Sequence, residues 1–126
     1  DLNLAAQDPE IAKILTPALQ HPKIKALLTP QSTPTEVWRE KAFEAAIENT
    51  WFSGIFDRVH LPQGWKQQKS RPLIIDFKTD TSQKHRESYK EQIDLYRKAL
   101  ARILGIEEKQ IDCSLIFLRT TEITEL

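Results

Sequence analysis

The sequence predicts one α/β domain built on a mixed β-sheet. Three strand-like segments, at roughly 36–47, 51–61 and 73–78, precede one long helical segment, and another strand follows it near 111–118. Strands joined by a tight turn pair antiparallel, whereas a strand that reaches the next one through a helix pairs with it in parallel. The chain has 126 residues, enough for one core but not for two, so residues 1–126 are expected to form a single domain.

The N-terminal region is predicted to be helical as far as Leu28. Pro9 suits the first turn of a helix, where its missing N–H is not needed. Apolar residues then recur at helical spacing: Ile11, Ile14, Leu15 and Leu19. Pro17 and Pro22 are expected to divide this region into two or three short helices. Residues 29–35 are rich in Thr, Pro and Ser and are predicted to form a loop.

Two antiparallel strands and a central third strand are predicted next. The first two are rich in strand-favouring residues, and Glu48-Asn49-Thr50 suits the turn between them. Residues 62–71 form a polar excursion. The third strand starts with Leu73-Ile74-Ile75, a continuous apolar run that is typical of a strand buried on both faces.

The long helix is predicted from a capping box and an apolar stripe. Ser88-Tyr89-Lys90-Glu91 is the capping box, and Gly105 is expected to end the helix. The stripe expected to be buried is Tyr89, Ile93, Tyr96, Leu100 and Ile103, and the residues expected to point outward are Lys90, Asp94, Arg97, Lys98 and Ala101. A strand at 111–118 and a short last strand at 121–126 follow.

Charge is unevenly distributed although the net charge is zero. Residues 58–102 carry 11 basic and 5 acidic groups, whereas each flanking segment has three more acidic than basic groups. A basic surface can bind phosphates by releasing counterions. A solvated helix face together with a lysine-rich loop explains the same distribution without a nucleic-acid partner.

Several classes of protein are disfavoured. The longest apolar runs are far too short to cross a membrane, and no secretory signal opens the chain. Cys113, the one cysteine, cannot form an internal disulfide or build a cysteine-ligated metal site alone. A reducing cytoplasm is therefore the expected location. Because the sequence contains no methionine, we expect it to be a fragment of a longer polypeptide.

Two carboxylates and a lysine are the residues best suited to catalysis. Asp57 and Asp76 lie near the ends of adjacent predicted strands, where they could converge on one Mg²⁺ ion, which prefers oxygen ligands. Lys78 shares a strand face with Asp76 and could orient a water or stabilise charge on phosphorus. The side chain of Phe77 should point to the opposite face, while its carbonyl could add a ligand.

Gln92 and Tyr96 are neighbours on the predicted helix and could hold the phosphate or the lysine in position.

Each motif alone has an ordinary explanation. An Asp-x-Lys triplet is common in strands, Asp57-Arg58 could be a surface ion pair, and Tyr96 could simply be a core residue.

Taken together, the motifs resemble those of the nuclease domain of RecB and AddA, in the PD-(D/E)xK superfamily. The matching segments are Gly54-Ile55-Phe56-Asp57-Arg58-Val59, Ile74-Ile75-Asp76-Phe77-Lys78-Thr79-Asp80 and Gln92-Ile93-Asp94-Leu95-Tyr96. The resemblance covers roughly residues 36–120 and implies a restriction-endonuclease-like mixed sheet that cleaves DNA with Mg²⁺ or Mn²⁺. It assigns Asp57 and Asp76 as metal ligands, Lys78 as the catalytic lysine, and Gln92 and Tyr96 as the family's Gln-x-x-x-Tyr motif. Glu40 lies in a segment similar to the family's Arg-Glu-x-x-Phe strand and is expected near the site.

The resemblance also implies a biological setting. It suggests an exonuclease at the C-terminus of a UvrD/Rep-type helicase–nuclease, acting in bacterial double-strand-break repair and recombination. Its partners would be DNA, the helicase domains of the same polypeptide and a second helicase–nuclease subunit. DNA contacts are expected from Arg58, Lys84, Arg86 and Lys90, although a solvated loop would explain the last three equally well.

One family feature is not found at its expected place. The family usually has a further metal-ligand histidine on a helix before these strands, and Leu19-Gln20-His21-Pro22 lacks that pattern. We interpret His21 as a surface residue at a helix break and expect the histidine-bearing helix upstream of Asp1, so that this fragment would bind metal weakly. Three alternatives stay open: a degenerate DNA-binding or scaffold module, an RNA-processing or CRISPR-associated nuclease, and a protein-interaction domain.

Overall fold

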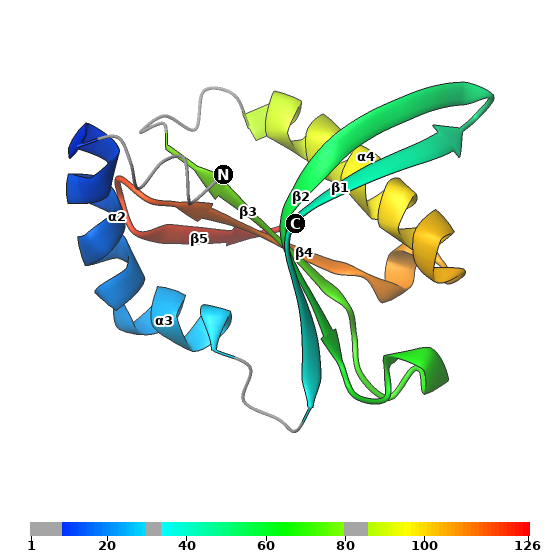
Figure 1. The fold of residues 1–126 in the computed structure, drawn as a ribbon, viewed down its shortest axis with the longest axis horizontal. Coiled ribbons are helices and arrows are strands. Elements are labelled where there is room, and N and C mark those ends of the chain that lie inside the picture. The colour runs from blue at the N-terminus through cyan, green and yellow to red at the C-terminus, as the bar shows by residue number, and fades with distance from the viewer. Residues whose placement is uncertain (1–8, 30–33, 80–85) are drawn as a thin grey trace.

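A five-stranded mixed β-sheet with helices on both faces forms the computed structural model of the protein (Figure 1). The structure describes residues 9–29, 34–79 and 86–126, apart from the side chains of residues 11 and 86. In spatial order the strands are β1 (Thr35–Ile47), β2 (Thr50–Pro62), β3 (Leu73–Lys78), β4 (Asp112–Phe117) and β5 (Glu122–Glu125). Only β3 and β4 are parallel neighbours; the other pairs of adjacent strands are antiparallel. The α/β class and the mixed sheet predicted from the sequence are confirmed.

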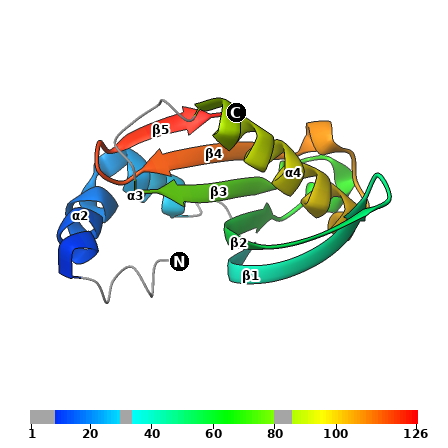
Figure 2. The same cartoon turned by 90° about the horizontal axis from the view of Figure 1, so that it is seen from above.

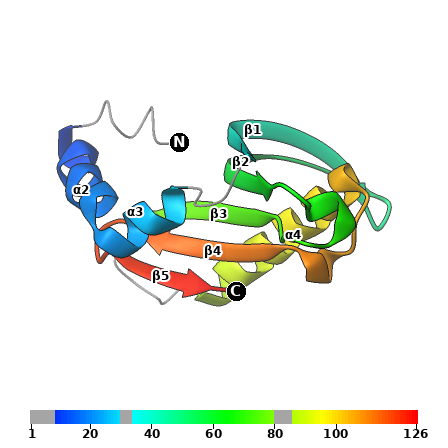
Figure 3. The same cartoon turned by 90° about the horizontal axis from the view of Figure 1, so that it is seen from below.

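In the described residues, three α-helices pack against this sheet. They are α2 (Pro9–Gln20), α3 (Pro22–Leu28) and α4 (Arg86–Leu104), and the short 3₁₀ turns η1 (Trp65–Gln67) and η3 (Glu108–Gln110) lie in the connections. Helix α4 lies on one face, and α2 and α3 lie on the other (Figures 2 and 3). Among the described helices, none is both long enough and apolar enough to cross a membrane.

The central position predicted for β3 is confirmed by its packing. Successive side chains of a strand point to opposite faces. Accordingly, Ile74 belongs to the core beneath α4, whereas Ile75 belongs to the core beneath α2 and α3. Because α4 connects two parallel strands, it is the crossover helix that the sequence predicted.

The β1–β2 hairpin bends at Glu40 and Asp57. The strands pair along their length, but this one pair is skipped between Arg39–Arg58 and Lys41–Phe56. Glu40 has a φ of 50°, in the left-handed region that non-glycine residues rarely adopt. Because the alternation is broken here, Trp38 and Phe43, which are an odd number of residues apart, both pack on the α4 side.

Strand β2 also leaves β3 at this point. The two strands pair only through residues 58–60 of β2. From Asp57 back to the turn after Ile47, the β1–β2 hairpin diverges from β3 and packs against α4 (Figure 1). The divergence creates a fork between β2 and β3, with Asp57 at its apex.

Two helix predictions are wrong. Pro17 lies inside α2 and does not divide it. Its ring is exposed while Leu15 and Ala18 are buried against the sheet, so packing on the inner side maintains the helix across the lost hydrogen bond. Ser88 is not the cap of α4, because the helix already begins at Arg86. The first described residue of α4, Arg86, directly follows residues that the structure does not describe, so the capping pattern at Ser88 lies inside the helix.

The prediction of which α4 residues face the sheet is also wrong near the C-terminal end of the helix. Ile103, predicted to be buried, is 45% exposed, and Ala101, predicted to point outward, is buried. Apolar residues occur at both three- and four-residue spacings in this segment, so the sequence pattern did not decide which side of the stripe faces the sheet. The predicted end is confirmed: Gly105 follows the helix with a φ of 70°, and the Ile106 N–H donates to the Ala101 carbonyl.

Candidate active site

Asp57 closes the fork between β2 and β3 with its side chain. Its Oδ2 accepts a hydrogen bond from the Phe77 N–H at 2.9 Å. The backbone ladder between these strands ends at Arg58, so the carboxylate takes the place of the next backbone acceptor. This hydrogen bond fixes the Asp57 carboxylate beside the C-terminal half of β3.

Asp76 lies next to Asp57 and is almost fully buried. It is 5% exposed, and its Oδ2 lies 2.7 Å from Lys78 Nζ. Apart from Lys78, the described part of the chain offers this oxygen no hydrogen-bond donor. Burial, helped by a hydrogen bond with Asp57, raises the pKa of Asp76 to about 6, although Lys78 opposes the shift.

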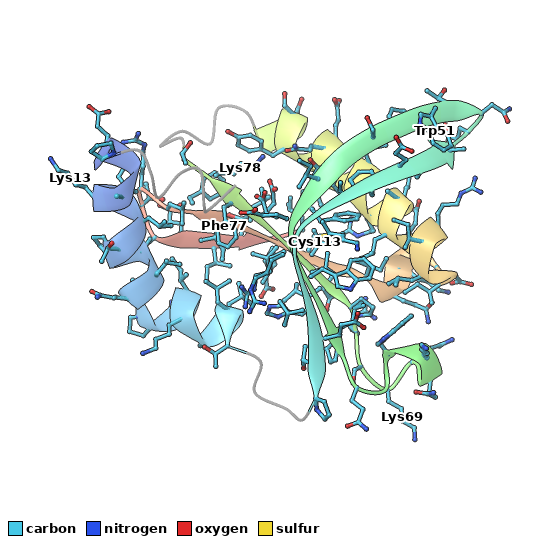
Figure 4. All side chains as sticks on the ribbon, viewed as in Figure 1. Lys13, Trp51, Lys69, Phe77, Lys78 and Cys113 are labelled. Carbon is cyan, nitrogen blue, oxygen red and sulfur yellow. The ribbon has the colours of Figure 1, made fainter. Side chains whose placement is uncertain are left out.

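Lys78 is held from both the sheet and α4. Besides its ion pair with Asp76, its Nζ donates to Gln92 Oε1 at 2.6 Å, and Gln92 Nε2 donates to the Tyr96 hydroxyl at 3.2 Å. Phe77, between the two catalytic candidates on β3, packs in the opposite core beneath α2 and α3; it and Lys78 are labelled in Figure 4. The structure therefore brings Asp57, Asp76, Lys78, Gln92 and Tyr96 into one cluster.

Two phenylalanine rings pack against Tyr96 and help to hold it in position. Its ring meets Phe43 and Phe56 edge-on, with ring centroids 5.6 Å apart in each case, and those two rings stack on each other at 4.4 Å. Gly54 makes this packing possible, because a Cβ there would lie 2.8 Å from the Phe43 ring. The glycine of the Gly-x-x-Asp motif is thus a packing requirement of the site.

One buried carboxylate, Asp76, and one half-buried carboxylate, Asp57, fit a hard divalent cation, since among the described residues Lys78 alone offers Asp76 Oδ2 a donor. Mg²⁺ commonly takes one or two carboxylates and keeps several waters, so it does not need a cage of protein ligands. In the described residues no three His, Cys, Asp or Glu side chains gather at one point. The Phe77 carbonyl remains a predicted ligand. Glu40 falls opposite Asp57 between the Arg39–Arg58 and Lys41–Phe56 pairs, where the ladder skips one pair, and its proximity to the site stays a prediction.

Arg58 and His60 form a separate polar pair on the side of α3. The Arg58 guanidinium donates to His60 Nε2 and to the Leu28 carbonyl, both at 2.8 Å. His60 is buried, and burial, reinforced by the charges of Arg58 and Arg39, lowers its pKa to about 4. Contact of Arg58 with DNA stays a prediction, since these hydrogen bonds already give its guanidinium a structural role.

The other predicted DNA-contacting residues are only partly described. Lys90 is exposed on α4. Lys84 lies outside the described residues, and Arg86 begins α4 with a side chain that is likewise not described. His21 caps the start of α3, where its Nδ1 accepts a hydrogen bond from the Lys23 N–H at 3.3 Å. The prediction that it occupies a helix break is confirmed.

Comparison with protein families gives a nearly full-length match. Residues 2–125 match the model of the PD-(D/E)XK nuclease superfamily. The chain belongs to this superfamily. No curated protein matches the sequence. The family and the mixed sheet with flanking helices agree, and membership of the PD-(D/E)XK superfamily indicates a nuclease domain, from a class that typically uses divalent metals.

Sequence reasoning missed one contact of this site. Tyr89 was expected only as part of the buried stripe of α4, but its ring centroid lies 4.6 Å from Lys78 Nζ. A signal was available: Tyr89 precedes Gln92 by three residues, so the two lie on the same face of the helix. The packing of Gly54 against Phe43 also had a signal, because the predicted turn at Glu48-Asn49-Thr50 places the two residues opposite each other in the hairpin.

Proposed function

We propose that this chain is the catalytic domain of a metal-dependent deoxyribonuclease. One observation carries the proposal: a continuous set of contacts links Asp57, Asp76, Lys78, Gln92 and Tyr96 from two strands and a helix. A member of the superfamily that served only as a scaffold would have no need to keep a lysine, only 13% exposed, between a carboxylate and an amide.

Each residue has a defined task in the proposed reaction. Asp57 and Asp76 would hold Mg²⁺ or Mn²⁺, with the Phe77 carbonyl as a further oxygen ligand. When bound, the ion would supply Lewis acidity to the scissile phosphate and help to activate water. Lys78 would orient the attacking water or stabilise negative charge on the phosphate oxygens. Gln92 holds the Lys78 ammonium through its side-chain oxygen, and Tyr96 holds Gln92.

The substrate and the setting are part of the proposal. We propose linear DNA as the substrate and exonucleolytic cleavage coupled to helicase domains in a longer bacterial repair and recombination protein. The Gln92–Tyr96 motif supports this branch of the superfamily. Phosphate contacts from Arg58, Lys84, Arg86 and Lys90 would add affinity that falls as salt rises.

A weakly active or inactive DNA-binding module is the second candidate function. It is favoured by the small number of ligands at the metal site. The described residues supply two carboxylates there, and no three His, Cys, Asp or Glu side chains form a cluster. It is also favoured by Asp76, whose raised pKa means that an ion must compete with a proton for the carboxylate below about pH 6.

Cleavage of linear DNA by the full-length protein tests the proposal. Single- and double-stranded substrates are incubated with Mg²⁺, with Mn²⁺ or with a chelator. Asp76→Ala and Lys78→Ala should each lower the rate by at least about a hundredfold, because each removes charge next to the reacting phosphate. Asp112→Asn and Lys109→Ala are matched controls with exposed side chains, and they should cleave at the wild-type rate.

Two outcomes separate the candidate functions. If the wild type binds DNA but does not cleave it with either metal, the inactive module is the better description. Retained cleavage in Asp76→Ala or Lys78→Ala would place the chemistry elsewhere and refute the assignment of the site.

A further inference from the structure

The Lys78 ammonium has a third neighbour in Tyr89. The ring centroid of Tyr89 lies 4.6 Å from Lys78 Nζ, within the distance at which an ammonium is attracted to an aromatic face. Tyr89 is half-buried near the start of α4, and its ring also contacts the buried Phe117, with the two centroids 6.1 Å apart. The ring thus lies between the hydrophobic core and the lysine.

The contacts of Lys78 indicate that the Tyr89 ring can hold the ammonium in place. A lysine ammonium has three N–H donors and a flexible four-carbon chain. Oxygens of Asp76 and Gln92 lie within reach of two donors, which leaves one for a reacting group. The lysine side chain is 13% exposed, so little water is available to hold the charge in place. An aromatic face attracts the ammonium without using a donor.

We propose that Tyr89 is a positioning residue, whose aromatic face fixes the Lys78 ammonium for catalysis. The proposal rests on the proposed nuclease function. The ring matters in this account through its electrostatic face, since an aliphatic side chain of similar size would also pack against Phe117. Losing the face should therefore leave the fold intact, lower kcat and hardly change KM, because Lys78 acts on the reaction more than on DNA binding.

A series of substitutions at this one position separates shape from electrostatics. In the full-length protein, Tyr89→Phe keeps the face, pentafluorophenylalanine at position 89 keeps the shape but reverses the ring's charge distribution, and Tyr89→Leu removes the ring. We expect kcat within about twofold of wild type for Tyr89→Phe and about tenfold lower for the other two, with KM within about twofold throughout. Leu95→Ala, another half-buried substitution on α4, is the control for packing and should not change kcat.

A second measurement needs no activity and no metal. In the wild type the Tyr89 ring should displace the proton resonances of the Lys78 methylene next to Nζ, and Tyr89→Leu should abolish the displacement. The proposal is overturned if Tyr89→Leu or the fluorinated ring keeps wild-type kcat, if Tyr89→Phe is as impaired as Tyr89→Leu, or if the resonances do not move. Wild-type kcat in Tyr89→Leu together with loss of cleavage in Lys78→Ala would refute the role of Tyr89 alone. Cleavage that survives Lys78→Ala would instead refute the proposed function.

Discussion

Acidification should destabilise the protein through His60. Its Nε2 already accepts a hydrogen bond from the Arg58 guanidinium, and its pKa falls from 6.5 in an unfolded chain to about 4 in the fold. Between these values the unfolded state binds a proton that the folded state does not. Stability is therefore lost as the pH falls from 6.5 to 4, and the loss from this group is roughly 2 to 3 kcal/mol.

His60→Gln isolates this contribution. Glutamine cannot titrate, but its side-chain oxygen can still accept the hydrogen bond from Arg58. The free energy of unfolding is measured by urea denaturation, followed by tryptophan fluorescence, in chelator between about pH 8 and pH 4. The difference between wild type and variant should be constant above about pH 7, and the wild type should lose an additional roughly 2 to 3 kcal/mol by pH 4.

Taking the difference removes the other titrating groups, which are common to both proteins. Asp76 in particular has the opposite slope over almost the same pH range, so the wild-type curve alone would look deceptively flat. Parallel curves for wild type and His60→Gln would show that His60 can be protonated in the fold, and the reasoning from burial and the Arg58 contact would be refuted.

Substitutions at three further positions test the site. Without metal, the wild type should lose roughly 2 to 3 kcal/mol relative to Asp76→Asn as the pH rises from about 4 to 6, because the folded pKa of about 6 lies above the unfolded value; equal slopes in urea denaturation would contradict this. Gly54→Ala should cost about 1 to 3 kcal/mol and slow cleavage, since its Cβ would collide with Phe43; wild-type stability and activity would argue against the close packing. At Glu40, with its φ of 50°, substitution by glycine should change the midpoint of thermal unfolding little, whereas Glu40→Val should lower it clearly; the reverse order would dismiss backbone strain at this residue.

The sequence predicted those features that depend on local periodicity. Asp76 and Lys78 share a face because they are two residues apart in a strand, and Gln92 lies beside Tyr96 because four residues make one helical turn. The fork that brings Asp57 to Asp76 could not be predicted in this way. It depends on where β2 stops pairing with β3, and this is decided by the hairpin bend at Glu40 and by the aromatic packing behind it.

The basic middle segment shows a second limit of sequence reasoning. Its excess of positive charge was compatible either with a surface for phosphates or with a solvated face, yet three of its arginines bind backbone carbonyls: Arg58 that of Leu28, Arg71 that of Lys109, and Arg97 those of Ile111 and Leu126. These guanidinium groups tie together segments that are distant in the chain. A count of charges cannot distinguish such structural ties from a surface available to a ligand.

The hydrogen bond between Asp57 and the Phe77 amide has a consequence for how activity can be lost in evolution. Removing the Asp57 carboxylate would leave a backbone amide without its acceptor at the apex of the fork. Removing Asp76 would take away a buried carboxyl and leave its partner Lys78 with the Gln92 oxygen as a remaining acceptor. A descendant that no longer cut its substrate would therefore tend to lose Asp76 before Asp57. In a related chain, an aspartate at the position of Asp57 therefore indicates common ancestry and a role in folding. An aspartate at the position of Asp76, on β3, is the one that indicates retained catalysis.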